Sequence, residues 1–80
     1  MDTREAVVWR IRDLCAEYEL TPNALSYRAS IPQATVKSIL NRESRNPGIV
    51  TIKKLCDGLG ITLQEFFEPE IFARLEQEIK

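Results

Sequence analysis

The sequence predicts an all-α fold, a bundle of five short helices followed by one more short helix at the C-terminal end. Apolar residues recur at spacings of three and four, which is the period of an amphipathic helix. Proline, glycine and capping residues separate these periodic segments. No segment alternates as a half-buried strand does. A length of 80 residues, with 44% hydrophobic and 29% charged side chains, suits one small globular domain.

The first helix is expected over residues 4–18, because its apolar side chains share one face at the helical period. These side chains are Val7, Ile11, Leu14 and Tyr18. Asp2 or Thr3 can cap the first turn, since either side chain accepts a hydrogen bond from a free backbone N–H. Trp9 points to the opposite side of the helix, so we expect another segment or a partner to cover its side chain.

Two short helices follow, over residues 22–28 and 32–41, with a tight turn at 29–31. Thr21 and Pro22 form a helix start, and Pro32 opens the second helix, because proline suits the first helical position. The inward side chains of this pair are Leu25, Val36, Ile39 and Leu40. The second helix is expected to be roughly 15 Å long at 1.5 Å per residue.

The remaining chain contains clear start and stop signals. Residues 42–48 include Ser, Asn, Pro and Gly and are expected to form a loop. A helix over 49–59 ends at Gly60, and Thr62 with Glu65 forms a capping box for a short helix that ends near residue 67. A last amphipathic helix is expected from residue 69, with an apolar stripe of Ile71, Phe72, Leu75 and Ile79.

Several function classes are excluded by what the sequence lacks. It has no histidine, no Gly-rich phosphate loop and no closely spaced cysteine pair, so we expect no catalytic site, no metal site and no cofactor. Cys15 and Cys56 fall on apolar helix faces and are expected to be reduced core residues. No apolar run approaches the roughly 18 residues of a membrane span and no signal peptide is present, which indicates a cytoplasmic protein without membrane contact.

The charge is unevenly distributed, although the formal net charge is only −1. Residues 22–56 carry six cationic side chains against one acid, Glu43, which gives a net charge of +5. The preceding and following segments carry net charges of −2 and −4. A basic middle between acidic ends is typical of a face that binds a polyanion, and a chance cluster of solvated lysines and arginines is the alternative.

Two short helices joined by a three-residue turn inside a helical bundle form a helix-turn-helix. The segment LTPNALSYRASIPQATVKSILN, followed by NPGIVTIKKLCDGLGITLQEFF, resembles the phage repressor and Cro (XRE) family of DNA-binding domains. The resemblance covers roughly residues 10–67 and depends most on Leu25, Ile31, Val36, Ile39, Asn46, Pro47 and the segment 59–61. It implies a helix-turn-helix domain over residues 1–68 that binds double-stranded DNA, with residues 69–80 as an amphipathic helix for packing or dimerisation.

The sequence departs from the family pattern at several positions. Pro22 stands where the family usually has a glutamine that braces a phosphate, so that contact is lost. Ser30 replaces the turn glycine and must take the strained conformation unless the turn adjusts. Pro32 replaces the usual Ser or Thr cap, and the next helix is expected to begin one residue earlier. Cys15 and Leu40 replace a buried Arg–Glu pair, an apolar exchange that is compatible with the same fold.

The resemblance implies that the helix over 32–41 enters the major groove. The outward side chains expected to contact base edges are Gln33, Ala34, Lys37 and Ser38. Gln33 suits adenine, Ala34 suits a thymine methyl group, and Lys37 can reach a guanine or a phosphate. The residues expected to contact phosphates, which fix position and affinity, are Tyr27, Thr35, Asn41, Arg42, Ser44, Arg45 and Asn46.

One such domain covers about half of a DNA site, so the resemblance implies a homodimer with half-sites about one helical turn apart. The expected dimer or packing surface consists of Trp9, Ile71, Phe72, Leu75 and Ile79, and in the packing case the C-terminal stripe folds back over Trp9. The indicated function is a homodimeric, sequence-specific transcriptional repressor without a small-molecule ligand. The alternatives are an antitoxin or mobile-element control protein with a protein partner, and a protein-interaction module that has lost DNA binding.

Overall fold

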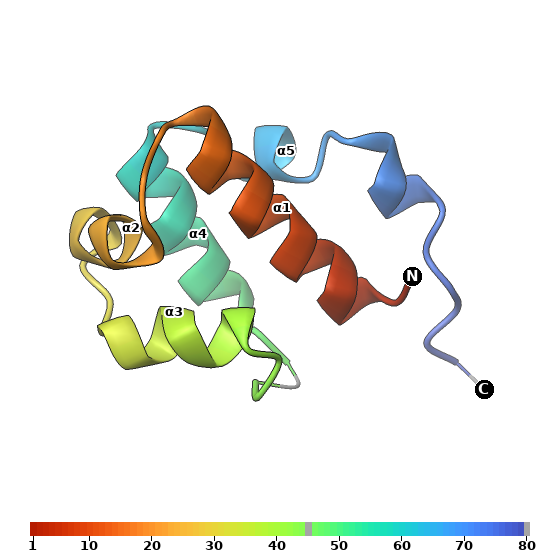
Figure 1. The fold of residues 1–80 in the computed structure, drawn as a ribbon. Helices are drawn as coiled ribbons and strands as arrows, with labels where there is room; N and C mark the ends of the chain where they lie inside the picture. Colours follow the sequence, from red (N-terminus) through yellow and green to blue (C-terminus); the bar gives the residue numbers. More distant parts are fainter. Residues whose placement is uncertain (45, 80) are drawn as a thin grey trace.

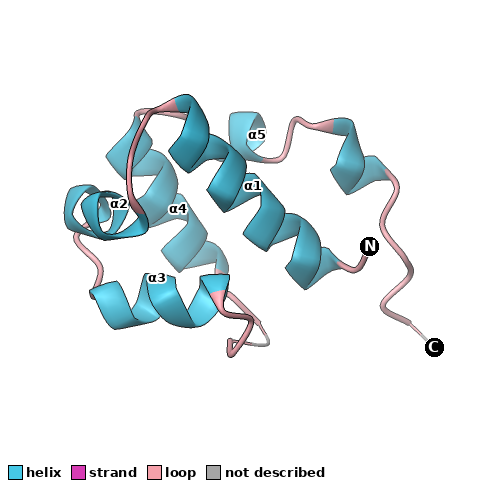
Figure 2. Cartoon of the chain, in the orientation of Figure 1, coloured by secondary structure: helices cyan, strands magenta, loops and turns pink. Residues whose placement is uncertain are grey.

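A computed structural model describes residues 1–44 and 46–79, and its regular elements are all helical (Figure 1). They are α1 (Thr3–Glu17), α2 (Pro22–Ala29), α3 (Gln33–Leu40), α4 (Ile49–Leu59), α5 (Leu63–Phe66) and the 3-10 helix η1 (Glu70–Ala73). Loops and turns connect them, and no strand occurs in the described residues (Figure 2). The predicted all-α fold with its bundle of five helices is therefore confirmed.

The core lies between the helices and contains the apolar side chains at the predicted inward positions. Cys15 and Cys56 are both buried there as free thiols, as predicted. Burial raises the pKa of both thiols, so they stay protonated and unreactive at neutral pH. Leu40 is buried in the same core as Cys15, so apolar packing occupies both positions where the family has an ion pair.

α2 and α4 cross in close contact at Gly58. A β-carbon at this position would lie 2.9 Å from the backbone nitrogen of Ala29 and 3.0 Å from its α-carbon. Real β-carbons essentially never approach backbone atoms so closely, so only glycine fits without a shift of one helix. The crossing fixes α2 against α4, and because a short turn connects α2 to α3, it also orients α3.

Three helices begin with the side-chain caps that the sequence predicts. Asp2 and Thr21 each accept a hydrogen bond from the backbone N–H three residues later, at 2.8 and 3.1 Å. Thr62 and Glu65 form the predicted capping box of α5, with both hydrogen bonds 3.0 Å long. These caps satisfy N–H groups that have no partner within their own helix.

The first four helices are each followed by a residue in the left-handed conformation. Gly60 follows α4 with φ of 73°, as predicted, whereas Glu19, Ser30 and Arg42 follow α1, α2 and α3 with φ of 54°, 56° and 62°. After each of them, the next backbone N–H donates to the carbonyl oxygen five residues earlier, at distances between 2.8 and 3.1 Å. This pattern is the Schellman motif. Ser30 thus takes the strained conformation expected from the missing glycine.

The predicted start of the third helix is wrong. α3 begins at Gln33 and not one residue earlier than in the family, because Pro32 is extended with ψ of 142° and forms the N-cap. Pro32 makes no side-chain cap hydrogen bond. The helix consequently spans eight residues and ends at Leu40.

The amphipathic helix predicted from residue 69 is wrong in length and type. Only η1 is helical, and residues 74–79 form no helix. A helix of about ten residues is marginal without extensive packing, and Ile79 is exposed. Glu76 and Glu78 would also lie at the C-terminal end of such a helix, where negative charge opposes the helix dipole.

The C-terminal segment instead runs past the start of α1 (Figure 1). The amino group of Met1 lies 3.4 Å from a carboxylate oxygen of Glu76, and the Thr3 hydroxyl donates to Glu78 at 2.9 Å. Phe72 packs against the core, with its ring centroid 5.0 Å from that of Phe67. The segment therefore folds back onto its own chain.

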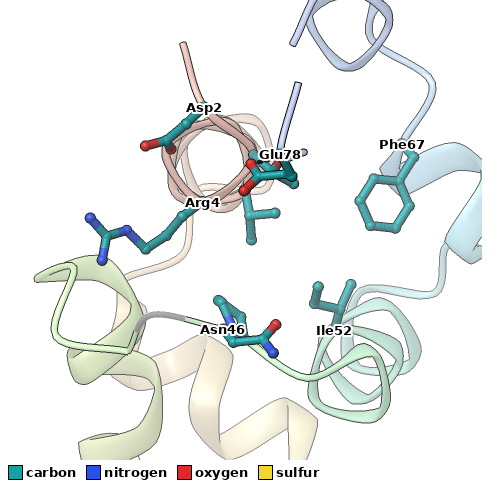
Figure 3. A pocket seen from close by; sticks show the side chains of 9 residues that line it. Asp2, Arg4, Asn46, Ile52, Phe67 and Glu78 are labelled. Carbon is teal, nitrogen blue, oxygen red and sulfur yellow. Dashed lines mark hydrogen bonds between the residues drawn. The ribbon is translucent and has the colours of Figure 1, made fainter. Parts of the chain in front are cut away.

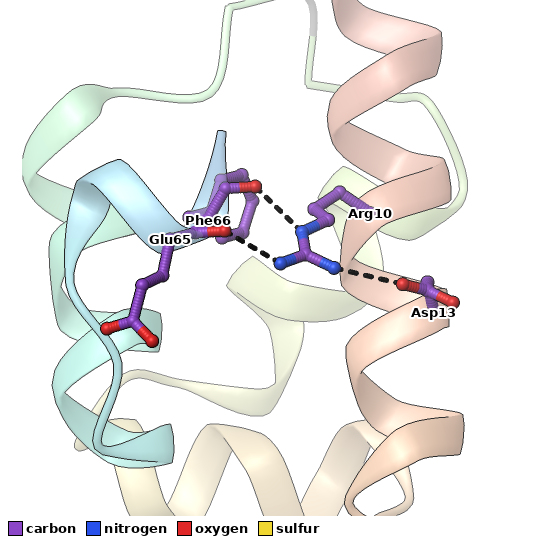
Figure 4. A network of polar contacts seen from close by, with 4 residues as sticks. All are labelled: Arg10, Asp13, Glu65 and Phe66. Carbon is purple, nitrogen blue, oxygen red and sulfur yellow. Dashed lines mark hydrogen bonds and ion pairs between the residues drawn. The ribbon is translucent and has the colours of Figure 1, made fainter. Parts of the chain in front are cut away.

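Arg10 joins α1 to α5 (Figure 4). Its Nε donates to the carbonyl oxygen of Phe66 at 2.7 Å, and one terminal nitrogen donates to that of Glu65 at 2.8 Å. The other terminal nitrogen binds the Asp13 carboxylate at 2.9 Å. The Glu65 carbonyl oxygen also accepts a hydrogen bond from the backbone N–H of Glu68 at 3.3 Å, and the guanidinium adds donors to the carbonyl oxygens of Glu65 and Phe66. Arg10 thereby caps the end of α5 and holds it on the bundle.

Candidate nucleic-acid interface

The outward face of α3 forms the centre of the candidate interface. The inward side chains of this helix are buried in the core, which turns Gln33, Ala34 and Lys37 to the outside, and all three are exposed. Ser38 lies at the edge of this face and is half-buried. An amide, a methyl group and an ammonium group thus lie on one side of a helix that fits a major groove.

The chain after α3 folds back over its last turn. The backbone N–H groups of Glu43 and Ser44 both donate to the carbonyl oxygen of Ser38, at 2.9 and 3.2 Å. A shallow depression of about 320 Å³ is consequently lined by Ala34, Thr35, Ser38, Ile39 and Ser44. Three of these residues carry hydroxyl groups, which can donate hydrogen bonds to phosphate oxygens or base edges.

Three further residues predicted to contact phosphates are exposed in the described part of the chain. Tyr27 in α2 is 88% exposed, which is unusual for a large ring and leaves its hydroxyl free for an external partner. Asn41 and Arg42 are exposed directly after α3. Arg45, which was also predicted to contact a phosphate, lies outside the described residues.

Asn46 lies at a cavity of about 500 Å³ between the start of α1, the loop before α4 and the C-terminal segment (Figure 3). Arg4 and Glu78 line the same cavity with charged groups, and Ile52 and Phe67 supply apolar surface. Asn46 is still exposed, so its amide is open to solvent at the rim.

Two arginines of α1 contact the end of α3. Arg12 donates to the carbonyl oxygen of Leu40, and Arg4 donates to that of Arg42, both at 3.4 Å. Cations at a helix C-terminus are favourable because they complement the helix dipole. Neither arginine was predicted to have a role. Their separation of eight residues, which places both on one helix face, is the signal that identifies them.

The surface around α3 is positively charged. Lys37 and Arg42 are exposed there, the two α1 arginines lie beside them, and Glu43 is the one acid of the loop segment 41–44. Lys53 contributes less free charge, because it forms an ion pair with Asp57 on α4. Arg4 and Arg12 belong to the acidic N-terminal segment, but they add their positive charge to the surface formed by the basic segment 22–56.

Other kinds of site find no support in the described part of the chain. Within residues 1–44 and 46–79, no group of three or more His, Cys, Asp or Glu residues is arranged to hold a metal ion. The described helices include none that is both long and apolar enough to cross a membrane.

The residues predicted for dimerisation or C-terminal packing do not form one stripe. Phe72 packs against the core, while Ile71 and Leu75 are half-buried. Trp9 is 41% exposed and Ile79 is 89% exposed. Without a helix over residues 74–79, Leu75 and Ile79 are not held on a common face with Ile71.

A different apolar surface, which was not predicted from the sequence, lies at the start of α4. Ile49 is 57% exposed and Val50 is 67% exposed. Ile49 also lines a groove of about 570 Å³ together with Leu63 and Phe67. The signal was present in the sequence, because Val50 lies nine positions before the buried Leu59 and so faces the opposite side of a helix at about 100° per residue.

Comparison with known proteins gives two matches. The family model of the Cro/C1-type helix-turn-helix DNA-binding domain matches residues 10–70. The chain is also similar to the prophage Lp1 protein 11, known from a crystal structure, with a TM-score of 0.81 and 32% sequence identity over 94% of this chain and 100% of that chain. None of the curated proteins compared with the chain matches it.

Proposed function

Since the chain belongs to the Cro/C1-type helix-turn-helix DNA-binding domain family, we propose that it is a sequence-specific regulator of transcription that recognises double-stranded DNA through α3. The observation that carries this proposal is the two-sided construction of α3. Its inward residues are buried in the core, and Gln33, Ala34 and Lys37 are exposed on the other side. A rigid helix with exposed polar and small side chains fits the major groove, where base pairs differ in their donors and acceptors.

The proposed base contacts follow from the chemistry of each side chain. The Gln33 amide can donate to adenine N7 or accept from its amino group, and the Ala34 methyl can pack on a thymine methyl group. Lys37 can donate to guanine O6 and N7. Ser38 is half-buried at the edge of the face, so we assign it a contact shared between a base edge and the adjacent backbone.

The proposed phosphate contacts are expected to flank the base contacts and to position α3 on the duplex. They are Tyr27, Thr35, Asn41, Arg42, Ser44, Arg45 and Asn46. Arg4 and Arg12 support them, because both donate to carbonyl oxygens at the end of α3 and bring positive charge to the same place. These contacts are expected to be insensitive to sequence and sensitive to salt.

We propose further that the chain acts as a homodimeric repressor, which occludes a promoter when two copies occupy adjacent half-sites. Half-sites one helical turn apart are separated by about 34 Å, and a two-fold axis relates both the protein copies and the DNA. This role requires binding and no catalytic step, so we propose no enzymatic activity. The proposed location is the cytoplasm, where the DNA target is accessible.

The test is selection of binding sites from a pool of random duplexes, repeated at two salt concentrations. We expect a two-fold symmetric sequence to be enriched, and the affinity for it to fall by roughly 10³-fold or more between 50 and 200 mM salt if six or more phosphates are contacted. Absence of enrichment at either salt concentration would refute sequence-specific recognition. Absence of any salt-dependent binding would also refute DNA binding and favour a protein-interaction module.

A further inference from the structure

We infer that the C-terminal segment, residues 74–79, makes an autoinhibitory contact that lowers the affinity of this chain for DNA. Glu78 lines the same cavity as Arg4 and Asn46, which belong to the proposed phosphate-binding surface. The segment therefore brings a negative charge to the place where the proposed function puts a DNA phosphate. The inference rests on that function and states how the same site is regulated.

The cavity brings Glu78 to the edge of the candidate DNA face. In Figure 3, Glu78 and Asn46 lie on two sides of the cavity, one from the C-terminal segment and one from the loop before α4. Arg4 lines it as well and donates to the carbonyl oxygen of Arg42, directly after α3. Carboxylates and phosphates accept hydrogen bonds from the same arginine and amide donors. Glu78 and a DNA phosphate therefore compete for this surface.

The other acid at the cavity is fixed in place. Asp2 is part of the α1 start, where it accepts a hydrogen bond from the Glu5 backbone N–H at 2.8 Å. Asp2 and Glu78 stand against one cation, Arg4, so the described charged residues that line the cavity have a formal net charge of −1. This charge becomes zero when Glu78 moves away, which makes the cavity more favourable for an anion.

The contacts that hold Glu78 in place are weak enough for DNA to displace them. The Thr3 hydroxyl donates to Glu78 at 2.9 Å, and the amino group of Met1 lies 3.4 Å from Glu76. Thr3, Glu76 and Glu78 are exposed, and polar contacts at the surface contribute little to stability because water screens them. Residues 74–79 form no helix, so no cooperative structure must be broken to release the segment.

A fixed anchor keeps the segment close to the cavity after release. Phe72, two residues before the segment, packs against the core with its ring centroid 5.0 Å from that of Phe67. Glu78 can then reach at most about 20 Å from this anchor. A short tether gives Glu78 an effective concentration on the order of millimolar. Weak contacts on a short tether produce reversible competition, which lowers DNA affinity without abolishing it.

The test compares DNA affinity by fluorescence anisotropy for the full chain and two variants, on the selected duplex and on a random one. Glu78→Gln removes the charge and keeps a side-chain oxygen that can accept from Thr3. Thr3→Val removes the hydroxyl and keeps every charge. Both variants are expected to bind both duplexes more tightly. The gain is roughly three- to tenfold for Glu78→Gln at about 0.05 M salt, and smaller for Thr3→Val because its released acid stays nearby.

The matched control is Glu70→Gln, which removes one exposed carboxylate from η1. Glu70 is paired with Arg74 and does not line the cavity. Its variant is expected to bind DNA as the wild type does at every salt concentration. The gain of the other two variants should shrink as salt is raised, since the Debye length falls from about 10 Å at 0.1 M to about 3 Å at 1 M. Loss of fold cannot imitate this result, because an unfolded chain would bind DNA less tightly.

Each outcome decides the inference. Equal affinities for the wild type, Glu78→Gln and Thr3→Val overturn it. It is also overturned when Glu70→Gln tightens binding as much as Glu78→Gln, since the effect is then one of net charge alone. In either case a wild type that selects a DNA sequence leaves the proposed function intact. Failure of all four proteins to bind any duplex overturns the proposed function and this inference together.

Discussion

At three helix ends, single residues hold the backbone in a conformation that most side chains avoid. Glu19, Ser30 and Arg42 lie in the left-handed region, where a side chain with a β-carbon costs roughly 1–2 kcal/mol. The cost is tolerated because each one closes a Schellman motif that satisfies the carbonyl oxygens of the preceding helix. A glycine at these positions would keep the hydrogen bonds and remove the strain.

Ser30→Gly is therefore expected to stabilise the chain by about 0.5–1 kcal/mol, since the relief of strain exceeds the added entropy of the unfolded chain. Urea unfolding followed by circular dichroism measures this difference. Glu19→Gly should act in the same direction, and Gly60→Ala in the opposite one because Gly60 already occupies this conformation. A loss of stability in Ser30→Gly would contradict the argument.

Two variants at the candidate interface should distinguish a base contact from a phosphate contact. Gln33→Ala is expected to cost about 1–3 kcal/mol on the selected site and to relax one base position. Arg42→Gln should weaken selected and random DNA alike and reduce the slope of log affinity against log salt by about 1. Fluorescence anisotropy with both duplexes measures these effects. Equal losses on both duplexes for Gln33→Ala would exclude its role as a base contact.

At the scale of elements, the crossing of α2 and α4 depends on the absence of a side chain. Gly58 brings the helices so close that any β-carbon would contact the backbone of Ala29. The caps also fix where α1 and α2 begin, because the side chains of Asp2 and Thr21 accept hydrogen bonds from backbone N–H groups in the first turn. Crossing and caps together set where α2 and α3 lie against α4.

Gly58→Ser is expected to destabilise the chain by about 1–3 kcal/mol, because the helices must move apart to admit the side chain. The matched control is Gly48→Ser. A β-carbon at Gly48 meets nothing within 4 Å, and serine is a good N-cap residue at the start of α4. Chemical denaturation should therefore show that Gly48→Ser leaves the free energy of unfolding unchanged or raises it slightly. Equal losses at both positions would disprove the close crossing.

The cap at Asp2 predicts a specific dependence on pH. The hydrogen bond from the Glu5 backbone N–H lowers the pKa of the Asp2 carboxyl. A lowered folded-state pKa adds stability above the unfolded pKa of about 3.9, and this stability is lost as the pH falls through the folded value. The difference in Tm between wild type and Asp2→Ala should accordingly be constant at neutral pH and shrink below about pH 4.

The control for this pH dependence is Thr21→Ala, which removes a cap with no titratable group. Its difference in Tm from wild type should not change with pH. Thermal unfolding of the three proteins between pH 2 and pH 7 provides the comparison. If the Tm difference from wild type shrank equally for both variants at low pH, titration of Asp2 would be ruled out as the cause.

At the scale of the whole molecule, arginines of α1 connect distant parts of the chain. Arg10 bonds to carbonyl oxygens 55 and 56 residues away, while Arg4 and Arg12 reach the end of α3. α1 thus contacts both the C-terminal part of the fold and the candidate DNA face. The planar guanidinium group of an arginine has several N–H donors, so one side chain can donate to more than one carbonyl oxygen.

Arg10→Lys is expected to destabilise the chain by about 1–3 kcal/mol, because an ammonium group cannot reproduce the guanidinium bonds to both carbonyl oxygens. The control is Arg74→Lys, whose ion pair with Glu70 is largely exposed and should change stability by less than about 0.5 kcal/mol. Thermal and urea unfolding measure both variants. Wild-type stability in Arg10→Lys would show that α5 is held by its apolar contacts alone.

Much of this molecule follows from local sequence signals. The positions of α1, α2, α4 and α5 depend on nearby residues, as do the caps at Asp2, Thr21 and Thr62 and the end at Gly60, and the structure confirms them. The exposed side of α3 was predictable for the same reason, because a helix with three buried residues has only one outward face.

What the sequence did not predict depends on contacts between distant residues. The role of Arg10 requires α5 to lie beside α1. Residues 74–79 form no helix, and Ile79, which is exposed, gives that segment none of the packing that a short helix needs. Gly58 resembles any helical glycine until its distance to Ala29 is known. The contacts of the base and phosphate residues with DNA remain predictions.

The contact between Met1 and Glu76 also has a topological consequence. Residues 1 and 3 contact residues 76 and 78, so a short peptide can join these two segments. With a new opening between α3 and α4, we expect the helices to keep their packing partners. The same bundle could then begin with α4, and its architecture would not depend on the order of the helices along the chain.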